Sequence, residues 1–113
     1  MKHLTVESKD LLIGDEAADL LTEYAAIVAD QGRGDRVDLH AISSDGDEVT
    51  TTIVLSAGTT IIVETAHNSF PEPDNADAIA YLRERIQRAT APPPAATEEM
   101  EGMEGMEEQF DDL

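Results

Sequence analysis

The residues of this sequence best suited to metal binding or proton transfer are three histidines, because imidazole titrates near neutral pH and ligates metals when neutral. His3, His40 and His67 are widely separated, no two are four residues apart, and none belongs to a His-Glu motif. A metal site or an activated nucleophile needs side chains that converge, and this spacing gives no sign of convergence. We therefore predict surface or edge-strand histidines, no catalytic residue, no metal and no cofactor.

Carboxylates are the second candidate chemistry. The segment Asp45-Gly46-Asp47-Glu48 places three of them close together, but a calcium loop has acids at alternating positions, then a glycine, and a Glu near the twelfth position. Here the glycine is the second residue, so we predict a hairpin turn with solvated acids. With 25 acidic residues among 113, neighbouring pairs arise by chance, and none indicates the shielded carboxyl that acid/base catalysis requires. We predict that the protein is not an enzyme.

Two shorter patterns carry little information. Arg33-Gly34-Asp35 resembles the integrin-recognition tripeptide, but it falls where a helix passes into a strand. We interpret it as a flexible turn after a helix that ends at glycine. Gly14 and Gly58 are isolated, whereas a phosphate-cradling loop needs clustered glycines and normally a Lys.

The C-terminal segment, residues 98–113, has the most distinctive pattern. Apolar side chains from Met100 onward recur at spacings of three and four residues among acids, which is typical of a helix that binds a groove with basic rims. Gly102 and Gly105 each cost about 1 kcal/mol relative to Ala, so the segment is predicted to be disordered alone. A solubilising tail is the alternative. The predicted partner-binding residues are Met103, Met106, Glu107, Glu108, Phe110, Asp111, Asp112 and Leu113.

Charge narrows the choice of partner. Residues 1–90 hold 17 acidic and all seven basic residues, a net charge of −10, and residues 91–113 hold eight acidic residues and no basic one. Direct binding to nucleic acid depends on Lys and Arg that replace counterions, and anionic membranes attract basic segments, so both are disfavoured. A protein partner with a basic or apolar-groove surface is predicted.

Composition limits the core and the compartment. Aromatic residues make up 4% of the chain and Trp is absent, so the core must consist of aliphatic side chains. The absence of Cys excludes disulfides and thiolate catalysis. The first residues alternate instead of forming the apolar region of a signal peptide, and no apolar run approaches the length of a membrane span. We expect a cytoplasmic protein.

The first elements follow from periodicity. Residues 3–7 and 11–13 flank a turn and predict an N-terminal strand or short hairpin. Asp15 is the expected N-cap of a helix that continues to Gly32. Its buried stripe is predicted to comprise Ala17, Leu20, Leu21, Tyr24, Ile27 and Val28.

Three β-branched, alternating runs follow and predict an antiparallel meander over residues 36–66, with Asp45-Gly46 in its first turn. Asp74 is the expected N-cap of a second helix, with Asp77 at its third position. Ile79, Leu82 and Ile86 form its apolar stripe.

Together these elements predict an α+β domain over residues 1–90 in the order β(β)αβββα, with four or five antiparallel strands and both helices on one face of the sheet. A Pro/Ala-rich linker at 91–97 and a disordered acidic tail at 98–113 follow. The first functional hypothesis is a non-catalytic binding or adaptor protein that uses the tail. The alternative is an acidic inhibitor, antitoxin-like or nucleic-acid-mimicking protein whose domain blocks a basic surface. A small enzyme is kept as a third hypothesis, because the sequence does not place the three histidines and the many carboxylates in space.

Overall fold

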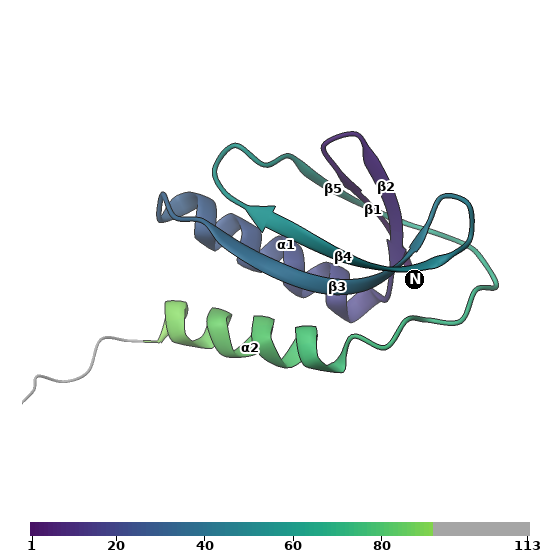
Figure 1. Ribbon diagram of the computed structural model, residues 1–113. Coiled ribbons are helices and arrows are strands. Elements are labelled where there is room, and N and C mark those ends of the chain that lie inside the picture. The colour runs from purple at the N-terminus through teal and green to yellow at the C-terminus, as the bar shows by residue number, and fades with distance from the viewer. Residues whose placement is uncertain (92–113) are drawn as a thin grey trace, which may run out of the picture.

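The computed structural model describes residues 1–91, and the predicted α+β class and element order are confirmed within them (Figure 1). No helix of this range is both long and apolar enough to cross a membrane. The elements are β1 (Lys2–Val6), β2 (Lys9–Ile13), α1 (Asp15–Asp30), β3 (Asp35–Ser43), β4 (Glu48–Leu55), β5 (Ile61–Thr65) and α2 (Ala76–Thr90).

The five strands form one antiparallel sheet in the order β4-β3-β2-β1-β5. The prediction of a three-stranded meander over residues 36–66 is wrong, because β5 pairs with β1 and not with β4. Two hydrogen bonds between Glu7 and Thr60, at 3.0 and 2.9 Å, begin this pairing. Alternation in residues 61–65 predicts a strand with one buried face, but it contains no information about which neighbouring strand will supply the hydrogen bonds.

Both helices pack on the same face of the sheet, as predicted (Figure 1). Alternate strand residues point toward the helices, so each strand contributes every second side chain to the core. Burial of each of the large aliphatic side chains contributes about 1.5–3 kcal/mol. The fully buried ones are Leu4, Leu11, Ile13, Leu21, Val28, Leu39, Leu55 and Leu82. No helix of residues 1–91 covers the opposite face, which we call the outer face (Figure 1).

The start of α1 differs from the prediction. Gly14, with extended backbone and no side-chain cap, occupies the N-cap position, and Asp15 is the first helical residue. The Asp15 carboxylate lies 3.1 Å from the amino group of Met1. A side chain at Gly14 would meet only the flexible end of the exposed Glu72 side chain, which can move aside.

The end of α1 agrees with the prediction of a glycine terminus. Gly32 has φ of 64°, a left-handed conformation that glycine adopts without steric cost. The N–H groups of Gly32 and Arg33 donate to the carbonyls of Ala29 and Val28. These bonds satisfy carbonyls that the helix itself leaves unpaired.

The start of α2 also differs from the prediction. Asn75 is the N-cap residue, and the helix begins at Ala76, so Asp77 is its second residue. Asp74 contributes by accepting a hydrogen bond from the N–H of Ala76 at 3.0 Å. The Asn75 side chain makes no capping bond because it is bound to β3 instead.

Candidate functional site

The predicted partner-binding residues Met103, Met106, Glu107, Glu108, Phe110, Asp111, Asp112 and Leu113 lie outside the described residues. The linker beyond Ala91 lies outside them too. The tail as a binding segment therefore stays a prediction, and the site must be sought on residues 1–91.

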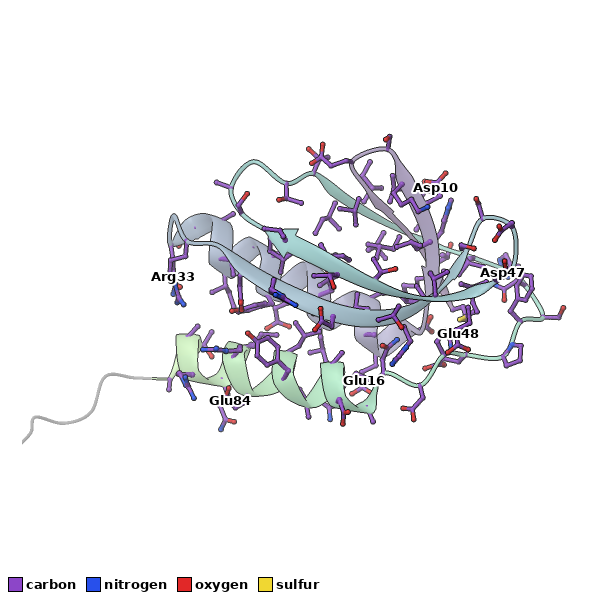
Figure 2. The ribbon with its side chains drawn as sticks, in the orientation of Figure 1. Asp10, Glu16, Arg33, Asp47, Glu48 and Glu84 are labelled. Carbon is purple, nitrogen blue, oxygen red and sulfur yellow. The ribbon has the colours of Figure 1, made fainter. Side chains whose placement is uncertain are left out.

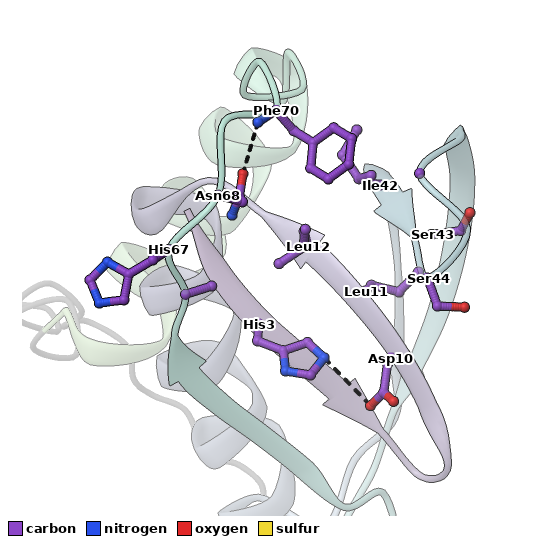
Figure 3. A pocket seen from close by; sticks show the side chains of 12 residues that line it. His3, Asp10, Leu11, Leu12, Ile42, Ser43, Ser44, His67, Asn68 and Phe70 are labelled. Carbon is purple, nitrogen blue, oxygen red and sulfur yellow. Dashed lines mark hydrogen bonds and ion pairs between the residues drawn. The ribbon is translucent and has the colours of Figure 1, made fainter.

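The three histidines are not brought to one place. His3 and His67 line a groove on the outer face, whereas His40 lines a different hollow beside α2. In Figure 3 the His67 ring points away from His3. Within residues 1–91 no group of three or more His, Cys, Asp or Glu side chains is arranged to hold a metal ion.

The groove on the outer face has a volume of about 330 Å³ and lies between the β3–β4 turn and the loop after β5 (Figure 3). Leu12 and Ile42 provide apolar surface, and Phe70, which is 46% exposed, borders it. His3 lies between two carboxylates, 3.7 Å from Asp10 and 3.8 Å from Glu64. These separations exceed hydrogen-bond length, so the imidazole is flanked by acids and bonded to neither of them.

The segment that resembled a calcium loop forms the β3–β4 turn, as the hairpin interpretation predicted. The hydroxyl of Ser43 donates to the Asp45 carboxylate, and the N–H of Asp47 donates to the same carboxylate at 3.3 Å. Figure 2 shows Asp47 at the end of the sheet.

In the Arg33-Gly34-Asp35 segment the prediction of a simple flexible turn misses the role of its last residue. Asp35 is the first residue of β3, and its carboxylate is bound on three sides. The hydroxyls of Tyr24 and Tyr81 donate to Oδ2 at 2.5 and 2.7 Å, and the N–H of Arg36 donates to Oδ1 at 2.8 Å. This carboxylate therefore joins α1, α2 and β3, and its Oδ2 accepts from both phenols.

The protonation of this Asp35 cluster follows from its surroundings. Burial would raise the pKa of Asp35, but the hydrogen bonds from Tyr24, Tyr81 and Arg36, with the charge of Arg85, outweigh it and lower the pKa below its usual value. Burial and the bond to Asp35 raise the pKa of Tyr24 to about 12. The Tyr81 pKa is raised by the same causes. The cluster is thus one carboxylate with two protonated phenols at neutral pH.

An acidic hollow lies along the seam between β3 and α2. Two adjoining hollows of about 350 and 320 Å³ are lined by residues 35–40 of β3 on one side and by residues 74–78 and Tyr81 on the other. Asp38, Asp77 and Ala78 line both hollows, so they form one continuous strip that we call the β3–α2 seam.

The charge of the seam is strongly unbalanced. Its lining residues include one basic residue, Arg36, and four acidic residues, Asp35, Asp38, Asp74 and Asp77. Asp38, Asp74 and Asp77 are exposed. Asp38 accepts a hydrogen bond from the Thr52 hydroxyl at 2.7 Å, and Asp74 accepts one from the N–H of Ala76 at 3.0 Å. Because a carboxylate has about four acceptor sites, each of them retains capacity for a partner. A strip of carboxylates of this kind attracts cationic groups. Among the described residues that line the seam, no nucleophilic side chain is paired with a base.

Besides the bond from Tyr81 to Asp35, the Asn75 side chain connects the two walls of the seam. Asn75 is 5% exposed, and its carboxamide accepts from the N–H of His40 at 2.7 Å and donates to the C=O of His40 at 2.8 Å. Two bonds from one residue's N–H and C=O are what a paired antiparallel strand makes. The carboxamide thus substitutes for a neighbouring strand at this position of β3.

Sequence reasoning did not identify Asp35 or Asn75 as important residues. The available signal was the pair Tyr24 and Tyr81, because a tyrosine on an apolar helix face needs a partner for its hydroxyl. Asn75 carried no such signal, since the same residue type is common in turns before helices.

Comparisons of the chain with protein-family models, with curated proteins and with solved structures found no match. Function is therefore inferred from the charge, shape and hydrogen-bonding groups of the surface.

Proposed function

We propose that this protein is a small, acidic, non-catalytic binding module whose partner is a protein with a basic surface. The observation that carries the proposal is the β3–α2 seam, an open concave strip lined by four carboxylates and one guanidinium. Three of those carboxylates, on Asp38, Asp74 and Asp77, are exposed. Lys and Arg side chains of a partner are the groups that complement such a strip.

The charge of the whole domain supports the same class of partner. Residues 1–90 carry a net charge of −10, which accelerates encounter with a basic surface and repels nucleic acids and anionic membranes. The seam then provides the local contact. Electrostatic attraction of this kind weakens as salt is added, because at 0.1 M salt counterions largely screen exposed charges that are more than about 10 Å apart.

The tail is proposed as a second contact with a protein partner. Its predicted residues are acidic and apolar in alternation at helical spacing, which suits a groove with basic rims. If the domain makes one contact with the partner and the tethered tail makes another, formation of either contact raises the effective concentration for the other. This combination is what makes an adaptor role the leading proposal.

A cationic probe tests the proposal for the seam. We would titrate the full chain with a labelled peptide of about ten residues in which Lys and Thr alternate. Neutralisation of the seam by Asp38→Asn with Asp77→Asn should weaken binding about two- to thirtyfold, since each exposed ion pair contributes about 0.2–1 kcal/mol. The matched control is Glu23→Gln with Asp30→Asn, which removes the same charge from exposed positions of α1.

The control variant should retain most of the affinity of the unmodified chain. Equal losses in both variants would show that only total charge matters, and a peptide that does not bind the unmodified chain would overturn the proposal. The acidic domain surface also suits the alternative of an inhibitor. Once a basic partner is identified, displacement of DNA from that partner would favour the inhibitor. A ternary complex of this protein, the partner and DNA would favour the adaptor.

A further inference from the structure

The edge of β3 that faces α2 is only partly paired. β2 ends at Ile13, and only Leu11 and Leu12 are in register with β3, opposite Ser43 and Ile42. The N-terminal part of β3 extends beyond the end of β2. Its edge opposite to β4, which we call the inner edge, faces the β3–α2 seam instead of another strand.

Successive residues of a strand direct their backbone N–H and C=O groups to opposite edges. The bonds of His40 therefore show which residues of β3 direct these groups toward the seam. The N–H and C=O of His40 bind Asn75, on the side away from β4. Residues two and four positions earlier, Asp38 and Arg36, therefore present their N–H and C=O groups to the same side. The N–H of Arg36 is bound by the Asp35 carboxylate.

At Asp38 the inner edge of β3 has no partner among residues 1–91. No hydrogen bond of these residues reaches its N–H or C=O from the seam, and Asp38 lines both hollows. One donor and one acceptor are thus presented together in an open acidic strip, next to a position where a carboxamide already occupies the place of a strand.

We infer that a short extended segment of a basic protein partner adds to β3 at Asp38 as an extra strand; this inference rests on the proposed function. The paired donor and acceptor suit an extended backbone, which can both accept and donate, whereas a lone ammonium or guanidinium can donate but cannot accept. Lys or Arg side chains that flank the paired peptide group reach Asp38 and Asp77 on the two walls. Main-chain bonds then provide affinity and side chains provide selectivity, as in other strand additions.

The charge of the seam selects this occupant over the two others that the chain itself could offer. The protein's own residues 91–113 contain eight acids and no base, so the carboxylates of the seam repel them. A second copy of the chain would present an equally acidic strip at Asp38 and Asp77. A basic foreign segment is the occupant that complements it.

Backbone-modified probes test the inference. The Lys-Thr peptide is prepared in two forms, one N-methylated at every Lys and one at every Thr, because alternate residues direct their N–H groups to opposite edges of a strand. One form loses the bonds to Asp38 and should bind about tenfold more weakly. The other form carries its methyl groups on the free edge and should bind like the unmodified peptide.

Amide hydrogen exchange locates the contact on the protein. Saturating unmodified peptide should slow exchange at the Asp38 N–H about tenfold or more, while the N–H of Leu39, which points toward β4, serves as the internal control. In addition, Asp38→Pro removes the N–H and the charge, whereas Asp38→Asn removes only the charge, so the Pro variant should bind more weakly. Proline suits this position because the N–H is outside the β3–β4 ladder.

Two results would overturn the inference: unchanged exchange at Asp38 under saturation, or equal affinities of the two N-methylated forms. If the peptide still bound in a seam-dependent manner, only strand addition would be wrong and the proposed function would stand. A peptide that did not bind the unmodified chain at all would instead remove the proposed function together with the inference.

Discussion

Asn75 and His40 are joined by two hydrogen bonds, with the carboxamide of Asn75 accepting from the N–H of His40 at 2.7 Å and donating to its C=O at 2.8 Å. The two residues are 35 positions apart, one at the start of α2 and the other in β3. This contact sets where α2 begins relative to the sheet, and thus sets one end of the β3–α2 seam.

The first prediction concerns this contact. Asn75→Ala should lower the free energy of unfolding by about 2 kcal/mol, because it leaves a donor and an acceptor of His40 without a partner in a partly buried place. Asn75→Asp should also destabilise, since a carboxylate cannot donate to the C=O. Urea denaturation measures both. The control Asn68→Ala removes an exposed side chain that bonds only locally to Phe70, and it should change stability by less than about 0.5 kcal/mol. Equal effects at the two positions would contradict the prediction.

The second prediction concerns the two phenols that share one oxygen of Asp35. Tyr24→Phe and Tyr81→Phe should each destabilise by about 1–3 kcal/mol, because each removes a hydrogen bond to a charged acceptor. The double variant should cost more than the sum of the single ones, since the carboxylate then retains only the N–H of Arg36 as a donor. Thermal and urea denaturation of the four proteins complete a double-mutant cycle. Strict additivity would show that the two hydroxyls act independently.

The third prediction concerns alkaline pH. The Tyr24 pKa is raised to about 12 in the folded protein, against about 10 for an unperturbed tyrosine. The stability that this shift contributes is present below pH 10 and is lost as the pH rises toward 12, because the unfolded chain releases its phenolic proton first. The unfolding free energy should therefore decline between these values, and less steeply in Tyr24→Phe. Denaturant titrations at several pH values test this, and identical slopes in both proteins would refute it.

The fourth prediction concerns the boundary of the domain. Deletion of residues 91–113 should leave the melting temperature nearly unchanged, because the periodic apolar positions stop at Ile86 and the linker adds no core residue. Calorimetry of the full and shortened chains measures the difference. A drop of about ten degrees or more in a domain of this size would show that the tail packs on the domain.

The fifth prediction concerns the tail as a binding segment. With a partner in hand, Phe110→Ala together with Leu113→Ala should speed dissociation, because each buried side chain contributes about 1.5–3 kcal/mol. Neutral replacements of Glu107, Glu108, Asp111 and Asp112 should instead slow association and flatten its salt dependence. Stopped-flow or surface-binding kinetics separate the two effects. Unchanged affinity after removal of residues 98–113 would leave the tail as a solubiliser and transfer binding to the domain surface.

Much of the secondary structure was predictable because its signals are local. Apolar positions at spacings of three and four residues marked both helices, and a glycine, Gly32, marked the end of the first, where the structure has φ of 64°. The hairpin turn that contains Asp45-Gly46 followed from the ease with which glycine adopts positive φ, and Gly46 has φ of 92°. Helix starts were less well predicted, since Asp15 and Asp74 are good caps by residue type, yet the N-cap positions are occupied by Gly14 and Asn75.

The sequence by itself determined that this chain forms an acidic α+β domain, because periodicity, capping residues and charge act over a few neighbouring positions. The tertiary structure alone decided that β5 pairs with β1, that Asp35 receives two distant phenols, and that Asn75 occupies a strand position beside His40. Each of these contacts joins residues far apart in the chain. Their partners are selected by the packing of whole elements, which no local pattern encodes, and the open edge at Asp38 exists only because of that packing.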